Sequence, residues 1–186
     1  MIVLIDMGDV LADFDGEVFT RWKKIYPSKY IVPLDERTSF YLHDEMPEES
    51  KELIRGINTA KGFIENLPEI EGGIDAINEI ADYGHTVFIC TAPLMKYTNC
   101  VPEKYMWIEK HLGKKWLERL ILTRDKTMIR GDILIDDKPE ISGVNKPIWE
   151  HILFDKAYNA NVKNQRRLTW KNWKKVLPEL LSDKIS

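Results

Sequence analysis

MIVLIDMGDVLADFD, residues 1–15, is the stretch of sequence from which the fold can be predicted. Its apolar run, residues 2–5, predicts a buried strand, and Asp6 follows at the carboxyl end of that strand. In open parallel sheets, ligands bind beyond the carboxyl ends of the strands. Asp6 is therefore expected to lie at a functional site.

Two further apolar runs end in side chains that carry oxygen. Residues 86–90, Thr-Val-Phe-Ile-Cys, are followed by Thr91, and residues 132–135, Asp-Ile-Leu-Ile, are followed by Asp136 and Asp137. Parallel strands end at one edge of a sheet, so these groups are expected to converge with Asp6. Carboxylate and carbonyl oxygens are the ligands that Mg²⁺ prefers. The sequence thus predicts a site for a magnesium ion and a phosphate group.

The rest of the chain alternates between helical and extended patterns. Apolar spacing predicts helices over residues 17–26, 50–57, 74–83, 105–112 and 170–181, and strands over residues 86–90, 117–123, 132–135 and 151–154. Such alternation is typical of parallel βαβ units. The predicted fold class is α/β, with a Rossmann-like, doubly wound parallel sheet.

Residues 16–72 lack strand patterns, although they lie between the first strand and the next one. We interpret them as a small helical cap inserted after the first strand, with residues 1–15 and 73–186 forming the α/β core. The aromatic residues Phe40, Tyr41 and Phe63 fall within this cap. They either form its apolar core or offer a stacking surface for a ring.

Composition excludes several classes of protein. A length of 186 residues suits one domain with a small insertion, and a net charge of -3 with mixed signs gives no basic field for a nucleic-acid polymer. No apolar run approaches the roughly 18 residues that a membrane helix needs. Cys90 and Cys100 are too few for a disulfide framework, which fits a reducing compartment. These features predict a cytoplasmic protein without a membrane partner.

The chain order Asp6, Thr91, Lys126, Asp137 resembles that of the haloacid dehalogenase (HAD) superfamily of phosphotransferases. The match extends over nearly the whole chain and is weakest over residues 27–60 and the tail. Within that superfamily, the chain resembles the 5′(3′)-deoxyribonucleotidases most in three segments: VFICTAPLMKYTNCVPEKYMWIEKHLG (87–113), ERLILTRDKTMIRGDILIDDKPEISG (118–143) and WEHILF (149–154).

The resemblance implies a role for each matching residue. Asp6 would be the nucleophile that forms an aspartyl-phosphate, and it would bind Mg²⁺ together with Asp137 and the backbone carbonyl of Gly8. Asp136 would support this metal site. The residues implied for phosphate binding are Thr91, Ala92, Lys104, Arg124 and Lys126. Those implied for the nucleobase pocket are Phe14, Phe40, Tyr41 and Phe63. Ala92 replaces a residue that is often serine in this family.

One departure from the family motif concerns the general acid. The family reads Asp-x-Asp-Gly-Val, with its second Asp protonating the leaving group, whereas this chain reads Asp6-Met7-Gly8-Asp9-Val10. In an extended backbone adjacent side chains point in different directions, so Asp9 is expected to point elsewhere, as a displaced acid. General acid catalysis contributes roughly 10²–10⁴-fold to a rate, so its loss would impair turnover without abolishing it.

Three hypotheses about function follow. The first is a magnesium-dependent phosphatase for deoxyribonucleoside monophosphates such as dUMP or dTMP, in which Asp9 or another group supplies the proton. The second is a catalytically impaired relative that binds magnesium and nucleotide. The third is a HAD phosphatase that acts on another small phosphorylated metabolite. The expected partner is a small molecule, and a homodimer is left open.

Overall fold

The computed structural model describes residues 1–181, which form a six-stranded parallel sheet flanked by helices. The strands are β1 (Ile2–Ile5), β2 (Thr86–Thr91), β3 (Leu120–Leu122), β4 (Ile133–Asp136), β5 (Glu150–Phe154) and β6 (Arg167–Leu168), in the spatial order β3-β2-β1-β4-β5-β6. All neighbouring strands pair in parallel. The predicted α/β fold class is therefore confirmed.

The register of the sheet explains why oxygen-bearing side chains meet at one edge. β1 lies in the middle, and its Ile5 is opposite Ile89 of β2 and Ile135 of β4. Residues 3–5 are fully buried, as expected for a central strand covered on both faces. The residues that follow these strands consequently emerge side by side.

The helices are α1 (Phe14–Ile25), α2 (Glu48–Asn58), α3 (Gly73–Asp82), α4 (Cys100–Leu112) and α5 (Trp173–Val176). The side chain of Asp13 caps α1 by accepting a hydrogen bond from the backbone N–H of Gly16 at 3.3 Å. α4 ends at Gly113, which has a φ of 86°. None of the helices in residues 1–181 is long and apolar enough to cross a membrane.

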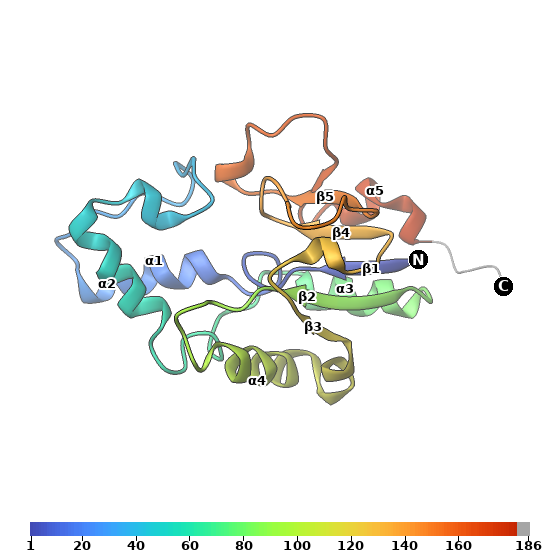
Figure 1. Cartoon of the computed structure of the whole chain (residues 1–186), viewed down its shortest axis with the longest axis horizontal. Helices are drawn as coiled ribbons and strands as arrows, with labels where there is room; N and C mark the ends of the chain where they lie inside the picture. The colour runs from blue at the N-terminus through green and yellow to red at the C-terminus, as the bar shows by residue number, and fades with distance from the viewer. Residues whose placement is uncertain (182–186) are drawn as a thin grey trace.

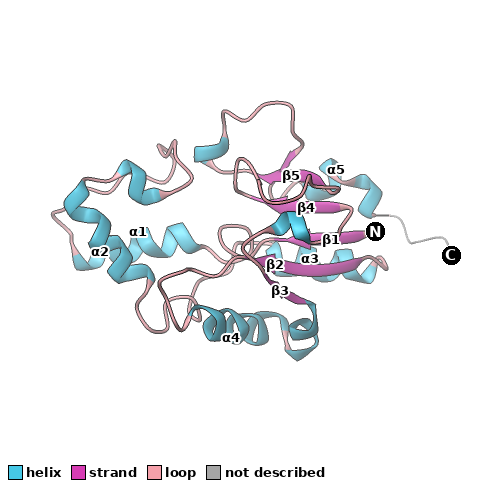
Figure 2. Cartoon of the chain, in the orientation of Figure 1, coloured by secondary structure: helices cyan, strands magenta, loops and turns pink. Residues whose placement is uncertain are grey.

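α1 and α2 lie beyond the carboxyl ends of the strands, on the side of the sheet opposite the N-terminus (Figure 1). Between β1 and α3, the structure has helices and loops but none of the named strands (Figure 2). This arrangement supports the division into a cap (16–72) and a core, which we retain as a proposal. α1 begins at Phe14, so this helix spans the proposed boundary.

The tail differs from the sequence prediction. Residues 170–181 were expected to form one amphipathic helix, but α5 covers only Trp173–Val176 and a 3₁₀ turn follows at Pro178–Leu180. The cause is Pro178, which lacks an N–H donor and disfavours helical geometry at the residue before it. The preceding Leu177 accordingly has a φ of −122° and a ψ of 57°.

The tail nevertheless belongs to the core. The indole Nε1 of Trp170 donates a hydrogen bond to the carbonyl oxygen of Val10 at 2.7 Å, and Leu177 and Leu180 are fully buried. β6 was not predicted from the sequence because a two-residue strand leaves no periodic pattern.

Candidate active site

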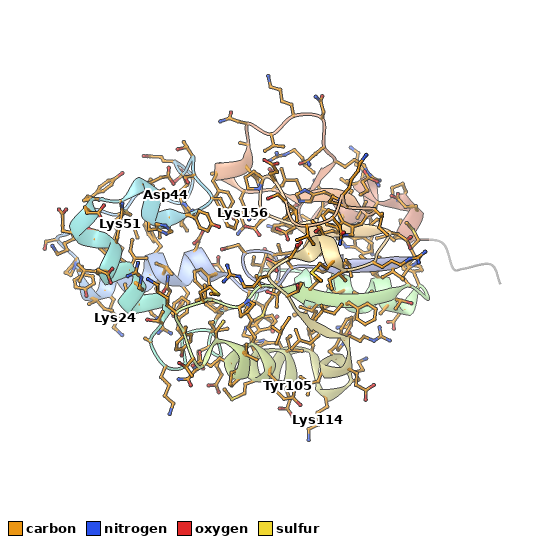
Figure 3. All side chains as sticks on the ribbon, viewed as in Figure 1. Lys24, Asp44, Lys51, Tyr105, Lys114 and Lys156 are labelled. Carbon is orange, nitrogen blue, oxygen red and sulfur yellow. The ribbon has the colours of Figure 1, made fainter. Side chains whose placement is uncertain are left out.

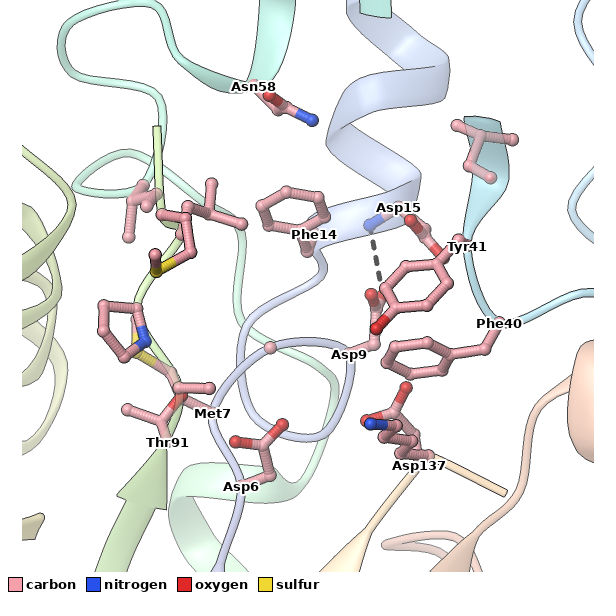
Figure 4. A pocket seen from close by; sticks show the side chains of 18 of the residues that line it. Asp6, Met7, Asp9, Phe14, Asp15, Phe40, Tyr41, Asn58, Thr91 and Asp137 are labelled. Carbon is pink, nitrogen blue, oxygen red and sulfur yellow. Dashed lines mark hydrogen bonds between the residues drawn. The ribbon is translucent and has the colours of Figure 1, made fainter. Parts of the chain in front are cut away.

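A cavity of about 610 Å³ opens at the carboxyl ends of the strands and is lined by both core and cap (Figure 4). Almost all of the residues that the sequence nominated line it: Asp6, Gly8, Asp9, Phe14, Phe40, Tyr41, Thr91, Ala92, Lys104, Arg124, Lys126, Asp136 and Asp137. Phe63 is different, because it is fully buried and packs its ring edge-on against Phe14 with the centroids 5.2 Å apart. Phe63 therefore supports the wall of the cavity from behind.

Three carboxylates and one ammonium group form the centre of the site. Oxygen atoms of Asp6, Asp136 and Asp137 lie within 4.8 Å of one another. Lys126 Nζ lies 2.8 Å from Asp6 Oδ1 and also donates a hydrogen bond to Asp136. Burial opposes the charge of this lysine, but the two carboxylates outweigh that effect and raise the pKa of Lys126 above its usual value.

The third carboxylate, that of Asp137, has no such ion pair with Lys126. Asp137 is buried, and burial together with the nearby carboxylates of Asp136, Asp9 and Asp6 raises its pKa well above the usual value. A divalent cation bound between these oxygens would offset that repulsion, and carboxylate oxygens are hard ligands. The cluster therefore fits a magnesium ion. Asp136 is already held by Lys126 and by the backbone N–H of Lys138, which suits a supporting role.

A second cationic group lies near Asp6 and lines the same cavity. Lys104 Nζ, from α4, donates a hydrogen bond to the hydroxyl oxygen of Thr91 at 2.8 Å. Burial lowers the pKa of Lys104, and the charge of Asp6 opposes that change. The site thus presents two buried lysines and a hydroxyl around one carboxylate. Such an arrangement can bind a phosphate group next to the oxygen that would attack it.

The loop that follows β1 differs from the extended backbone that was assumed for it. Asp9 was expected to point elsewhere than a side chain at position 8 would, and it has a φ of 56° in the left-handed region. Its carboxylate therefore turns into the cavity, where Oδ1 accepts a hydrogen bond from the backbone N–H of Asp15 at 3.1 Å (Figure 4). Lys156 Nζ lies 3.4 Å from the same oxygen. Burial raises the pKa of Asp9 to about 6, although Lys156 opposes the rise.

Gly8 leaves space that a side chain could fill. A Cβ atom added at this position would meet no heavy atom within 4 Å. The family's aspartate would therefore fit here without a backbone clash. The exchange of Gly8 and Asp9 has removed one carboxylate from this position and placed another on the next residue.

The cap contributes an aromatic wall to the cavity. The rings of Phe40 and Tyr41 meet edge to face with their centroids 4.9 Å apart, and Lys138 Nζ lies 5.8 Å from the Phe40 centroid. Phe14 lines the opposite side (Figure 4). Aromatic faces that line the same cavity as the two buried lysines suit a ring system attached to a phosphate.

Some residues next to the site gave no signal in the sequence. Arg37 and Lys156 lie in loops and Tyr158 in a short 3₁₀ helix, Ala157–Asn159, all outside any periodic pattern or motif. Tyr158 donates a hydrogen bond to Asp137, and Arg37 forms an ion pair with Asp15. Lys156 lies between the core and the cap (Figure 3). Only the folded arrangement of the chain brings these side chains against residues that line the cavity, namely Asp15, Asp9 and Asp137.

Comparison with known proteins agrees with this geometry. Residues 1–184 match the model of the family described as "5′ nucleotidase, deoxy (Pyrimidine), cytosolic type C protein". A Bordetella pertussis protein assigned as a 5′(3′)-deoxyribonucleotidase is 45% identical over 177 residues, which is 95% of each chain. The human 5′(3′)-deoxyribonucleotidase of cytosolic type is 41% identical over 185 residues, covering 94% of this chain and 92% of its own.

Solved structures show the same fold at low sequence identity. A HAD-family hydrolase from Deinococcus radiodurans, with bound phosphate and sodium, superposes with a TM-score of 0.58 at 12% identity and covers 96% of this chain and 95% of its own. A haloacid dehalogenase-like hydrolase from Xanthomonas campestris gives a TM-score of 0.56 at 11% identity, with 97% and 91% covered. With its HAD-like fold and its sequence match over nearly the full length, the chain belongs to the 5′(3′)-deoxyribonucleotidase family.

Proposed function

We propose that the protein is a magnesium-dependent phosphatase that releases phosphate from deoxyribonucleoside monophosphates such as dUMP and dTMP. The observation that carries this proposal is the composition of the single cavity described above. It brings Asp6 together with two buried lysines, Lys126 and Lys104, and it is also lined by the aromatic rings of Phe14, Phe40 and Tyr41. A nucleotide with its phosphate beside the lysines and its base against the aromatic rings would match this lining.

Asp6 would begin the reaction by attacking the phosphorus atom in line with the sugar oxygen. A bond forms between its carboxylate oxygen and phosphorus, and the bond from phosphorus to the sugar oxygen breaks. Lys126 and Lys104 would stabilise the charge that develops on the phosphoryl oxygens, with the Thr91 hydroxyl as a further contact. Water would then hydrolyse the aspartyl-phosphate, restore Asp6 and release phosphate.

Magnesium would be held by the carboxylates of Asp6 and Asp137 and by the carbonyl of Gly8. When bound, it would supply positive charge to the phosphoryl oxygens and offset the repulsion among the carboxylates. Asp136 would keep Lys126 in place beside Asp6, as its hydrogen bond indicates.

The leaving sugar oxygen needs a proton, and Asp9 is the carboxyl group that the loop offers. Its orientation into the cavity and its burial support this role. The competing candidate is an impaired enzyme that binds nucleotide and magnesium. The observation in its favour is that Asp9 Oδ1 is already bound by the N–H of Asp15 and lies close to Lys156.

A double exchange, Gly8→Asp with Asp9→Gly, separates these two candidates. It restores the order of residues in the family motif. Position 8 has room for a Cβ atom, and the positive φ at position 9 favours glycine. If the acid is missing in the native chain, phosphate release from dUMP with Mg²⁺ should rise by about 10²-fold or more. A native chain that already turns over rapidly, with no gain in the variant, would show that Asp9 or another group supplies the proton.

Single variants give the matched controls for this experiment. Asp6→Asn should abolish phosphate release in both backgrounds, because the attacking oxygen is lost. Asp9→Asn alone should lower the rate if Asp9 is the acid and leave it unchanged if the native chain lacks one. The names of the relatives also support a deoxyribonucleotide as the small-molecule partner. A cytosolic location is our proposal from the human relative of cytosolic type at 41% identity, beside which a mouse relative of mitochondrial type is 40% identical.

A further inference from the structure

Tyr158 lies in the loop between β5 and β6 and contacts the metal-binding edge of the core. Its side chain is buried, with 7% exposed, and its hydroxyl donates a hydrogen bond to Asp137 Oδ2. The next residue, Asn159, donates from Nδ2 to the backbone carbonyl of Asp137 at 2.7 Å. This loop therefore fixes both the carboxylate and the backbone of Asp137.

The ring of Tyr158 contacts the cap on its other side. The guanidinium carbon of Arg37 lies 4.6 Å from the ring centroid, and the ring of Phe40 meets it edge-on at 5.8 Å. A cation over an aromatic face is attracted to the ring, and the attraction is stronger at desolvated sites. Arg37 is only 2% exposed, so this contact belongs to the desolvated class. One side chain of the core thus touches the metal site with its hydroxyl and the cap with its ring.

Arg37 in turn fixes the segment of the cap that carries the aromatic wall. Its guanidinium donates hydrogen bonds to the carbonyl oxygens of Ser39 at 2.9 Å and Phe40 at 2.8 Å. It also pairs with Asp15 at the start of α1. Any change at Tyr158 therefore reaches Phe40 and Tyr41 through a continuous set of contacts. In the other direction, Phe40 contacts the ring of Tyr158, whose hydroxyl binds Asp137.

We propose that Tyr158 is a positioning residue that couples metal binding at Asp137 to the position of the cap over the nucleotide. The hydroxyl orients the Asp137 carboxylate, and the ring is the surface on which Arg37 and Phe40 rest. This inference rests on the proposed function for the identity of the metal and the nucleotide. Because coupling between two sites is reciprocal, a ligand in the cap should strengthen metal binding, and the metal should strengthen binding in the cap.

The first test removes only the hydroxyl. Tyr158→Phe keeps the ring, and Mg²⁺ affinity is measured by calorimetry without nucleotide, so that turnover plays no part. Loss of a group that orients a metal ligand typically weakens metal binding by about 10–100-fold, and we expect a loss of about tenfold or more. The matched control is Tyr105→Phe, an exposed tyrosine on α4, which should bind Mg²⁺ like the native chain (Figure 3).

The second test measures the coupling itself. Deoxyuridine carries the base and sugar but no phosphate, so it can occupy the aromatic part of the cavity without touching the metal. In the native chain it should raise Mg²⁺ affinity by about fivefold or more, the lower end of typical coupling. Arg37→Met removes the charge over the ring together with its hydrogen bonds to the Ser39 and Phe40 carbonyls. At deoxyuridine concentrations that saturate the variant, it should abolish that gain while leaving the Mg²⁺ affinity measured without deoxyuridine nearly unchanged.

Defined outcomes would overturn the inference. A purely structural role for Tyr158 would lower the unfolding temperature of the metal-free Tyr158→Phe variant but leave its Mg²⁺ affinity at the native value. That result overturns the positioning role, and so does a native chain that binds no Mg²⁺. If deoxyuridine raises the Mg²⁺ affinity of Arg37→Met as much as that of the native chain, the coupling is overturned. The proposed function fails separately, if the native chain with Mg²⁺ releases no phosphate from dUMP or dTMP. The binding comparison would still decide the role of Tyr158.

Discussion

The buried Lys126 lies between the buried carboxylate of Asp136 and the partly buried carboxylate of Asp6, and this placement predicts a large effect for a single substitution. Lys126→Met keeps the length of the side chain but leaves Asp6 and Asp136 without their cation. Breaking a buried ion pair by removing one partner typically costs about 3–5 kcal/mol of unfolding free energy. We expect a loss of this size in metal-free urea unfolding, together with the loss of phosphate release.

The matched control for this substitution is Lys114→Met. Lys114 is exposed, with 86% of its side chain accessible, and its nearest carboxylate oxygen on Glu109 is 3.8 Å away. Surface ion pairs contribute about 0–1 kcal/mol, so this variant should unfold nearly like the native chain. Equal stability of the two variants would mean that Lys126 does not balance the charge of the carboxylates.

At the scale of single residues, the sequence predicted which site residues meet when their position is set by the end of a strand. Asp6, Thr91 and Asp136 follow or end apolar runs, and parallel strands bring such residues to one edge. The direction of Asp9 could not be predicted, because it depends on a left-handed φ in a loop without periodicity. Tyr158 was missed for a related reason, since the path of a loop is set by the packing of the whole chain.

At the scale of elements, α4 connects the core to the end of the cap. Glu103, one residue before Lys104, accepts hydrogen bonds from the backbone N–H groups of Gly62 at 2.7 Å and Ile64 at 2.9 Å. Tyr97 donates a third hydrogen bond to the same carboxylate. Burial favours the neutral acid, but these donors outweigh it and hold the pKa of Glu103 below its usual value.

Glu103→Gln should loosen this connection. The amide retains one acceptor oxygen but places a donor against another N–H donor. Hydrogen bonds to charged groups contribute about 1.5–3 kcal/mol each, so we expect about 2 kcal/mol less protection for the segment 60–67. Hydrogen–deuterium exchange of that segment measures the effect. Glu109→Gln, on the same helix and partly exposed, is the control, and equal exchange in both variants would contradict the connection.

The same connection should depend on pH. A carboxyl group whose pKa is lower in the folded state stabilises the fold fully above the pKa of the unfolded chain, which is about 4.3 for glutamate. Its contribution is lost as the pH falls through the lower, folded value. Protection of segment 60–67 in the native chain should therefore be constant from pH 6 upward and fall below about pH 4. Glu103→Gln should remove this pH dependence.

The elements themselves were predicted unevenly. The strands around β1 and the helix α3 followed from clear apolar patterns. The tail was predicted wrongly, because its apolar spacing resembles a helix while Pro178 prevents a continuous one. β6 is held by pairing with β5 and not by its own sequence. Local patterns thus predicted the centre of the sheet better than its edge.

At the scale of the whole molecule, the cavity belongs to neither part of the chain alone. The core supplies Asp6, Thr91 and the lysines, and the segment between β1 and α3 supplies most of the aromatic wall. The absence of strand patterns in residues 16–72 led us to propose an inserted cap. They could not predict how the cap rests on the core, because that depends on contacts such as the one between Arg37 and Tyr158.

This division of the cavity predicts how activity should depend on the substrate. Stacking of a base on an aromatic side chain contributes about 1–3 kcal/mol, which corresponds to roughly 5–150-fold in kcat/KM. We expect dUMP to exceed deoxyribose 5-phosphate by a factor in this range or more, because the latter leaves the aromatic part of the cavity empty. Binding energy from the base should also raise kcat, since remote contacts can be used to position the reacting group.

Tyr41→Leu supplies the internal comparison for this prediction. Tyr41 lines the cavity but is half exposed, so its substitution should spare the core. The variant should lose activity toward dUMP while keeping its activity toward deoxyribose 5-phosphate, so the ratio between the two substrates should fall. Tyr105→Phe should leave the ratio unchanged. Equal native rates for nucleotides and sugar phosphates would instead favour a phosphatase for another small metabolite, with the aromatic wall serving only to hold the cap together.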